Sequence, residues 1–108
     1  MSTVTTHVLD TAQGRPAEGV PVQLQRTTDS SVIGKSTTDA DGRVSDFGSG
    51  QVEPGVYQLR FDVAAYARAS GQEFFFPEVT VTFTITDERH YHVPLLLSPF
   101  AYSTYRGS

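Results

Sequence analysis

Apolar and polar residues alternate along much of this chain, which is the pattern of β-strands with one buried face. Residues 20–25 alternate valine or leucine with proline or glutamine, and residues 79–86 alternate valine, phenylalanine or isoleucine with threonine. Such β-branched runs disfavour a helix. Turn-forming segments rich in glycine, proline and aspartate separate the strands, namely AQGRPAEG, TDADGR and EPG. The pattern predicts an all-β fold, an antiparallel β-sandwich.

One segment, DVAAYARASG at residues 62–71, departs from this alternation. Its alanines are strong helix formers. Asp62 is suited to cap the first turn, and Gly71 is suited to the left-handed position that ends a helix. We therefore expect one short helix over about residues 63–70 in an otherwise β protein.

The last strand-like segment, HYHVPLLLSP at residues 90–99, has two unlike faces. Side chains that alternate along a strand point to opposite sides. The face expected in the core carries Tyr91, Val93, Leu95 and Leu97. The opposite face carries His90, His92, Pro94, Leu96 and Ser98. Because it mixes apolar and imidazole side chains, this second face predicts a cleft or a subunit interface rather than open water. Pro94 lacks a backbone donor and favours an edge or a bulge.

The first strand-like segment repeats this arrangement, with Thr3, Thr5, His7 and Leu9 on the face opposite Val4 and Val8. All three histidines of the chain therefore lie on two strands. Each has an ordinary interpretation as a half-buried polar side chain, and each has a side-chain pKa suited to proton transfer near neutral pH. His90 and His92, with His7, also have a spacing compatible with a three-histidine zinc site, although no second shell is evident.

Composition narrows the classes of protein further. The 108 residues predict a single domain over 1–108. The chain has no cysteine, and its formal net charge is −4 without a basic stripe, so nucleic acid is not an expected partner. Apolar runs long enough to cross a membrane are missing, and MSTVTTHVLD does not resemble a signal peptide. We therefore expect a cytoplasmic protein with no membrane contact.

Two further segments carry candidate polar chemistry. TDADGR has the residues of a tight turn and lacks the ligands of a calcium loop, and Arg43 at its end is either a solvated cation or a clamp for a planar polar substrate. The ending Tyr105-Arg106-Gly107-Ser108 is either frayed or packed, and the aromatic residues before it favour packing.

The chain resembles the 5-hydroxyisourate hydrolases, the transthyretin-like enzymes of urate breakdown. The resemblance rests on THVLDTAQGRPAEGVPV, TDADGR, FFFPEVTVTF and HYHVPLLLSPFAYSTYRGS, and it covers nearly the whole chain. The first two motifs are shared with related sandwich modules and support the fold more than an activity. His7, the HYH strand and the YRGS ending discriminate, since the hormone-carrying transthyretins lack them. One departure, Ala101 in place of a common glycine, touches no catalytic position.

The resemblance implies a transthyretin-like sandwich of seven to eight strands. It also implies a homotetramer, a dimer of dimers with active sites at the dimer–dimer interface. It assigns the catalytic set to His7, Arg43, His92 and Ser108. The substrate-binding set that it implies is Tyr105, Arg106, Gly107, Leu96 and Pro94. No cofactor and no metal are implied.

The implied reaction is hydrolysis of a cyclic amide in 5-hydroxyisourate, which gives 2-oxo-4-hydroxy-4-carboxy-5-ureidoimidazoline. His7 and His92 are the expected base and its proton-handling partner, in either order. Arg43 is expected to stabilise the oxyanion, Arg106 to orient the substrate or anchor the tail, and Ser108 to position water or substrate through its hydroxyl or terminal carboxylate. The alternatives are a non-catalytic transthyretin-type protein that binds a small ligand and a secreted interaction module.

Overall fold

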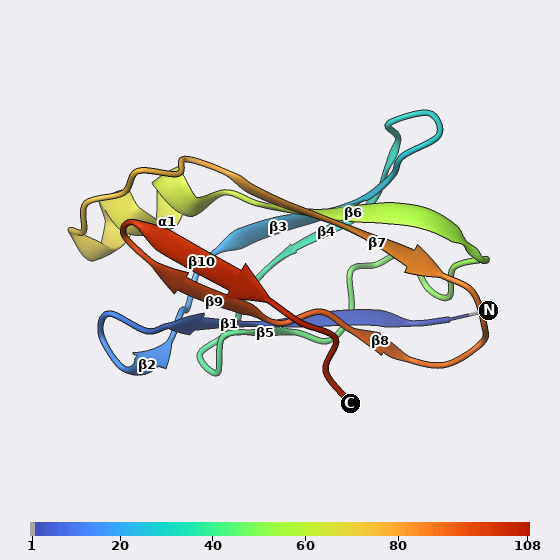
Figure 1. The fold of residues 1–108 in the computed structure, drawn as a ribbon, viewed down its shortest axis with the longest axis horizontal. Helices are drawn as coiled ribbons and strands as arrows, with labels where there is room; N and C mark the ends of the chain where they lie inside the picture. The colour runs from blue at the N-terminus through green and yellow to red at the C-terminus, as the bar shows by residue number, and fades with distance from the viewer. Residues whose placement is uncertain (1) are drawn as a thin grey trace.

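The computed structural model describes residues 2–108 and places the strands in two facing sheets (Figure 1). In the first sheet every segment except β10 pairs with β1, and β10 pairs with β9. Its members are β1 (Val4–Asp10), β2 (Arg15–Pro16), β5 (Arg43–Val44), β8 (Tyr91–His92), β9 (Leu95–Ser98) and β10 (Ala101–Thr104). The second sheet has the order β4-β3-β6-β7. Its members are β3 (Pro21–Arg26), β4 (Val32–Thr37), β6 (Gly55–Phe61) and β7 (Val79–Ile85).

This architecture confirms the predicted β-sandwich, with two differences in detail. Residues 2–108 form ten strand segments rather than seven or eight, because three of the segments have only two residues each. In addition, β1 runs parallel to β8 and β9, while the other pairings are antiparallel. The parallel pairing sets Thr5 opposite His92 and Leu9 opposite Leu96. The two ends of the sequence therefore lie side by side.

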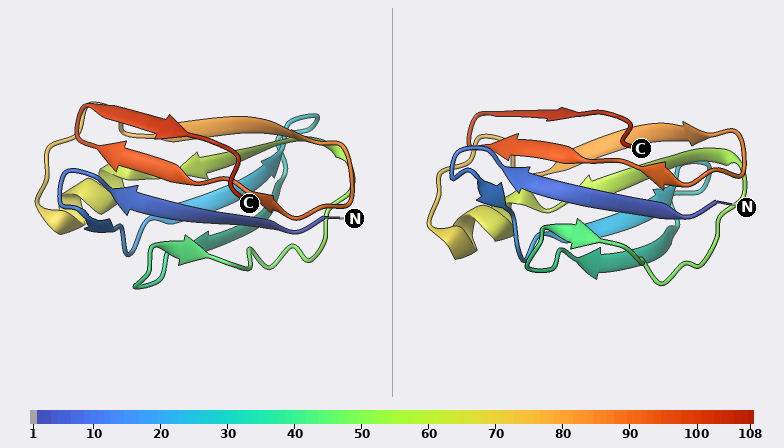
Figure 2. Two further views of the ribbon diagram at one scale, coloured as in Figure 1. Left: turned by 60° about the horizontal axis from the view of Figure 1, so that its bottom comes forward. Right: turned by 90° about the horizontal axis from the view of Figure 1, so that it is seen from below.

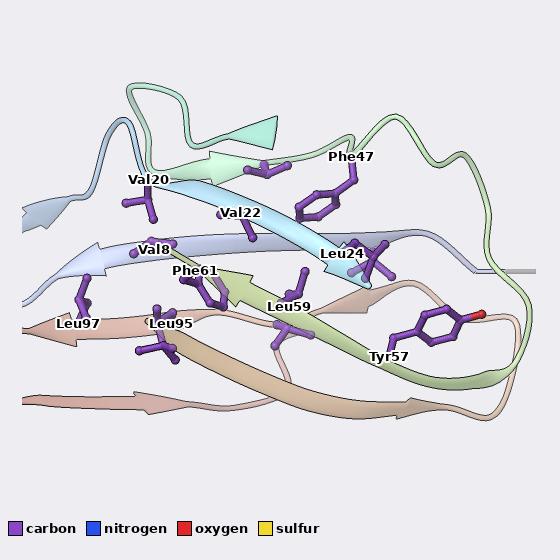
Figure 3. Close-up of a cluster of buried hydrophobic side chains, with 14 of the residues drawn as sticks. Val8, Val20, Val22, Leu24, Phe47, Tyr57, Leu59, Phe61, Leu95 and Leu97 are labelled. Atoms are coloured by element: carbon purple, nitrogen blue, oxygen red, sulfur yellow. The ribbon is translucent and has the colours of Figure 1, made fainter. Parts of the chain in front are cut away.

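The hydrophobic core fills the space between the two sheets (Figure 3). Val8 and Leu95 contribute from the first sheet, and Leu24, Leu59 and Phe61 contribute from the second, all with no exposed surface. Burying each such side chain stabilises the fold by about 1.5–3 kcal/mol before entropy is counted. The inward face predicted for the last strand-like segment is confirmed, since its four core positions are all buried.

The single helix in residues 2–108 is α1 (Val63–Ser70), as predicted. Its N-cap is Asp62, whose carboxylate accepts a hydrogen bond of 3.0 Å from the Ala65 N–H. Gly71 ends the helix with a left-handed φ of 69°. The helix lies at the end of the sandwich opposite the β7–β8 connection (Figure 1). Within the described residues, no helix has the length and apolar character needed to span a membrane.

A buried carboxylate ties the end of β1 to α1. Asp10 is only 2% exposed, and it accepts hydrogen bonds from the Tyr66 hydroxyl at 2.6 Å, the Gln72 amide at 2.9 Å and the Gln13 N–H at 3.0 Å. Burial alone would raise the pKa of Asp10, but these hydrogen bonds outweigh it and hold the pKa below its usual value. Burial, together with the hydrogen bond to Asp10, raises the pKa of Tyr66 to about 12. The cluster is a structural anchor.

Candidate active site

An open cleft lies on the outer side of the first sheet, where β1, β5, β8 and the C-terminal segment meet. Figure 2 shows the chain ending beside β1 and β8. The cleft has a volume of about 190 Å³. Its lining consists of Thr5, Thr6, Arg43, Val44, Ser45, His90, His92 and Ser108. Four sequence segments that are far apart along the chain thus supply one polar surface.

The TDADGR turn places Arg43 at the cleft. Asp39 accepts hydrogen bonds from the N–H groups of Asp41 at 2.9 Å and Arg43 at 3.0 Å. Gly42 has a φ of 75° and packs against the Val8 carbonyl, so a side chain there would clash with β1. The turn is therefore held against β1, and Arg43 enters the sheet opposite His7. The exposed guanidinium of Arg43 is free to meet an anionic or carbonyl oxygen.

His92 is half-buried on β8 and interacts electrostatically with Arg43. Its Nδ1 lies 2.7 Å from the Thr5 hydroxyl, which is on the paired strand β1. Burial lowers the pKa of His92, and electrostatic interaction with Arg43, and then with His7 and His90, lowers it further. The imidazole is therefore neutral at pH 7, the form in which it accepts a proton.

His7 lies beside the cleft rather than in its lining. It is half-buried on β1 and is aligned with Arg43 across the β1–β5 pairing. An electrostatic interaction with His7 is one of the causes of the lowered pKa of His92. The structure thus brings His7, Arg43, His92 and Ser108 into one region, with three of these four in the cleft wall.

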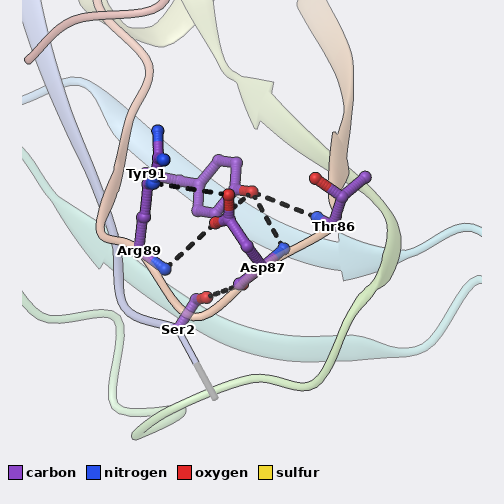
Figure 4. Close-up of polar contacts among 5 residues, drawn as sticks. All are labelled: Ser2, Thr86, Asp87, Arg89 and Tyr91. Carbon is purple, nitrogen blue, oxygen red and sulfur yellow. Dashed lines mark hydrogen bonds and ion pairs between the residues drawn. The ribbon is translucent and has the colours of Figure 1, made fainter.

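The tail is held against β8 by two contacts. The Gly107 N–H donates a 2.8 Å hydrogen bond to the His92 carbonyl, and a Cβ on Gly107 would lie 2.5 Å from the His92 ring. The Arg106 guanidinium lies 4.2 Å from the centre of the Tyr91 ring, a cation–π contact. Tyr91 is itself fixed, because its hydroxyl donates to Asp87 at 2.9 Å and accepts from the Thr86 N–H (Figure 4). The tail is packed, and Ser108 reaches the cleft as a result.

None of the five residues predicted to bind substrate belongs to the cleft lining, and two of them, Arg106 and Gly107, make the tail contacts described above. Pro94 is fully buried, and its ring packs near Gly107. It lies in the break between β8 and β9, which agrees with its missing backbone donor. Leu96 is half-buried on β9 next to Leu9, and Tyr105 is 54% exposed. The substrate-binding role of these residues therefore stays a prediction of the resemblance.

Thr5 is a cleft residue that sequence reasoning missed, and His90 was assigned no role there beyond a possible metal site. Thr5 lies 2.8 Å from His90 Nε2 as well as 2.7 Å from His92 Nδ1, and Thr3 lies 2.6 Å from His90 Nδ1. Alternation already placed Thr5 on the outer face with His7, but the partner strand was unknown. In residues 2–108 there is no group of three or more histidine, cysteine or acidic side chains placed to hold a metal ion.

The chain is similar to known proteins along nearly its whole length. A family model described as the HIUase/Transthyretin family matches residues 4–107. A mouse protein named 5-hydroxyisourate hydrolase is 48% identical, and the alignment covers 99% of this chain and 96% of that protein. The solved structure of Klebsiella pneumoniae 5-hydroxyisourate hydrolase superposes with a TM-score of 0.91 at 38% identity, and all of both chains is covered. A sea bream transthyretin in complex with thyroxine superposes with a TM-score of 0.88 at 34% identity, covering 97% of this chain and 94% of that one.

Proposed function

The chain belongs to the HIUase/Transthyretin family, and on that premise we propose that it hydrolyses 5-hydroxyisourate to 2-oxo-4-hydroxy-4-carboxy-5-ureidoimidazoline in urate degradation. It is an enzyme, a hydrolase. Relatives named 5-hydroxyisourate hydrolase match it along nearly their full length. The observation that carries the assignment to a site is the cleft whose lining includes Arg43, Ser108 and His92, whose pKa is lowered. These are the groups that water attack on a cyclic amide requires.

His92 acts as the general base. Its lowered pKa keeps the imidazole neutral at pH 7, so its free nitrogen takes a proton from water as the water attacks the ring carbonyl. His7, aligned with Arg43 on the neighbouring strand, serves as the second proton-handling group. The carbonyl carbon gains the water oxygen, and the ring C–N bond then breaks as its nitrogen receives a proton.

Arg43 stabilises the negative charge that develops on the attacked oxygen. Its guanidinium carries a permanent positive charge and projects from a turn that is fixed to β1. Ser108, which also lines the cleft, positions the water or the substrate. Gly107 and Arg106 act through the tail, since their contacts with His92 and Tyr91 hold Ser108 in place. Tyr105 and Leu96 complete the surroundings of the bound substrate, and Pro94 acts through the tail, since it packs against Gly107.

A homotetramer, arranged as a dimer of dimers, completes the site in this proposal. The cleft of one chain holds about 190 Å³. That is below the roughly 300–1,000 Å³ of typical ligand pockets. Leu9 and Leu96 form an apolar half-buried pair on the same outer face. A second chain seated on this face would enclose the substrate. Size-exclusion chromatography with light scattering tests for the homotetramer, and a monomer at micromolar concentration would contradict it.

The cytoplasmic location stays a prediction of the sequence.

A transthyretin-type binding protein is the second candidate, because the fold matches the sea bream transthyretin almost as well as the bacterial hydrolase structure. Such a protein would hold a small ligand on the same face without turnover. The cluster of His92, Arg43 and Ser108 favours the hydrolase, since binding alone does not require a neutral base beside a cation.

Ultraviolet decay of freshly generated 5-hydroxyisourate tests the proposed reaction. We expect the wild-type protein to accelerate the decay in proportion to its concentration. Heat-denatured protein and the His92→Ala variant serve as controls for non-specific effects. Decay at the uncatalysed rate in the presence of folded wild-type protein would overturn the proposal in favour of a binding protein.

A further inference from the structure

Four side chains form a continuous hydrogen-bonded chain that runs from the cleft to the surface. Thr5 Oγ1 lies 2.7 Å from His92 Nδ1 and 2.8 Å from His90 Nε2. The other nitrogen of His90, Nδ1, lies 2.6 Å from Thr3 Oγ1. The two imidazole rings are 6.4 Å apart and nearly parallel, at 18°. His92 is half-buried, whereas His90 is exposed, so the chain of hydrogen bonds leads toward solvent.

The single proton of the Thr5 hydroxyl restricts how these bonds are arranged. A hydroxyl between two ring nitrogens donates to one and accepts from the other. If Thr5 donated to His92 Nδ1, then neutral His92 would carry its proton on Nε2 and have no lone pair for water. In the reverse arrangement His92 Nδ1–H donates to Thr5, and Thr5 donates to His90 Nε2. His90 Nδ1–H then donates to Thr3, and His92 Nε2 is left free as a base.

We propose that Thr5 and His90 form a proton relay for the hydrolytic reaction, in which Thr5 sets the reactive tautomer of His92 and His90 passes the released proton to solvent. This inference rests on the proposed function. Neither residue needs to touch the substrate for this purpose, so both are positioning residues for His92.

The relay conserves protons at each step. His92 Nε2 takes a proton from the attacking water, and His92 Nδ1–H passes its proton to Thr5 while the Thr5 hydroxyl proton passes to His90 Nε2. His90 then loses its Nδ1 proton to solvent. Hydrolysis of a cyclic amide gives a carboxylic acid, which is ionised near pH 7. One proton must therefore leave the site for each turnover, and the relay supplies a path. After the product leaves, His92 Nε2 gives its proton to water in the open cleft and His90 Nδ1 takes up a proton from solvent, while reverse transfer through Thr5 restores the Nδ1–H form of His92. This resetting step releases one proton and takes up one, so the net release remains one proton for each turnover.

Variants of Thr5 test the relay directly. Thr5→Val keeps the β-branched shape and removes the hydroxyl, and Thr5→Ser keeps the hydroxyl. We expect Thr5→Val to lower kcat about tenfold or more, as is usual when the outer partner of a functional histidine is lost, with KM nearly unchanged. Thr5→Ser should restore most of that loss. Thr37→Val is the matched control, because it makes the same substitution at an exposed position of β4 in the other sheet. It should retain wild-type kcat.

His90→Ala tests the solvent end of the relay. In dilute buffer we expect a lowered kcat that exogenous imidazole restores, because a small base can replace His90 at the exposed end. Imidazole should not rescue Thr5→Val, where the link itself is missing. A merely structural role for either residue would show no difference in rescue between the two variants.

Nitrogen-15 NMR of the histidine rings separates this inference from the proposed function. It needs no turnover. We expect His92 to be protonated on Nδ1 in the wild type and to shift toward the Nε2–H form in Thr5→Val. Active wild type with equal kcat in Thr5→Val and Thr37→Val would overturn the relay and leave the hydrolase intact. A wild type that does not hydrolyse 5-hydroxyisourate would overturn both, and His92 carrying its proton on Nε2 in the active wild type would overturn the relay alone.

Discussion

A polar cluster lies near each end of β1. One cluster favours the charged form of its central side chain, and the other favours the neutral form. Near one end, Asp10 is buried and accepts hydrogen bonds from Tyr66 and Gln72. Toward the other end, Thr5 contacts His92 in an open cleft lined by Arg43. Both Asp10 and His92 have lowered pKa values. For the carboxylate the shift favours the charged form, and for the imidazole it favours the neutral form.

This difference separates an anchor from a reactive site. The donors around Asp10 match the charge of the carboxylate, so the cluster stabilises the folded state and leaves no group free to react. The neighbours of His92 repel the charge that it would gain, so the fold gives up some stability at acid pH and keeps a base available at neutral pH. Variants at the two ends of β1 should therefore affect different measurements.

Removal of the imidazole at the open cluster should have the largest effect. His92→Ala is expected to lower turnover of 5-hydroxyisourate by about 10²-fold or more, because the general base is lost. Its unfolding free energy should change little, since the side chain is only half-buried. Tyr66→Phe, in α1 beside Asp10 at the other end of β1, is the contrasting variant and should lower stability with unchanged kcat. Near-wild-type turnover in folded His92→Ala would contradict the assignment.

Loss of the Arg43 charge should have the next largest effect. Arg43→Gln is expected to lower kcat about 100-fold through the lost oxyanion stabilisation. After burial, the Arg43 charge is the largest cause of the lowered pKa of His92, so the variant should raise that pKa toward its ordinary value. The acid limb of the pH–rate profile then moves to higher pH. NMR titration of the His92 ring provides the independent check, and Arg60→Gln in the second sheet is the control. An unmoved His92 titration would contradict the proximity of the two charges.

A substitution in the Asp10 anchor should change the stability of the fold rather than the turnover of substrate. Asp10→Asn is expected to lower the unfolding free energy by about 1.5–3 kcal/mol at pH 7, the range for hydrogen bonds to a charged group. The folded pKa of Asp10 lies below the unfolded value of about 3.9. Its contribution is thus complete above that value and is lost as the pH falls through the folded pKa. Urea unfolding from pH 7 to pH 3 should show the two proteins converging at acid pH. A constant difference across this range would contradict the anchor.

Local patterns in the sequence were enough to predict much of the fold. The helix bounds follow from Asp62 and Gly71, which cap α1 at the expected positions. The inward face of the last strand-like segment follows from its period of two, and Leu95 and Leu97 are buried as predicted. These features depend on neighbours in the sequence, and so the sequence alone reveals them.

Pairing between distant segments could not be predicted in the same way. Alternation placed Thr5 and His92 each on an outer face, but it says nothing about which strands pair or in which direction. Only the parallel register between β1 and β8 brings these two side chains to 2.7 Å across 87 residues of sequence. Pro94 is a second case, because alternation placed it outward, while a break between β8 and β9 and the returning tail bury it. The involvement of His7, Arg43, His92 and Ser108 came from the family resemblance, and their catalytic roles stay a prediction.

The packing of the tail against His92 offers the smallest and most local perturbation. A Cβ at Gly107 would lie 2.5 Å from Cδ2 of His92 and 3.3 Å from Cγ of Pro94. Pro94 is fully buried and cannot yield, so Gly107→Ala should push the tail and the His92 ring apart. Since Ser108 follows directly, kcat is expected to fall about tenfold, an effect of the size that supporting residues around a functional histidine usually have. Steady-state kinetics and the His92 ring signals measure the displacement.

Gly34→Ala is the matched control for this last variant. A Cβ at Gly34 would lie 2.6 Å from the Phe47 carbonyl oxygen, so the clash is equally close but lies at β4 in the second sheet. This control should lower thermal stability and leave both kcat per folded molecule and the His92 signals unchanged. If Gly107→Ala behaves like Gly34→Ala, then the tail only covers Pro94, and Ser108 has no positioning role in the cleft. If only Gly107→Ala loses kcat, the tail is coupled to the base through the crowded contact with His92.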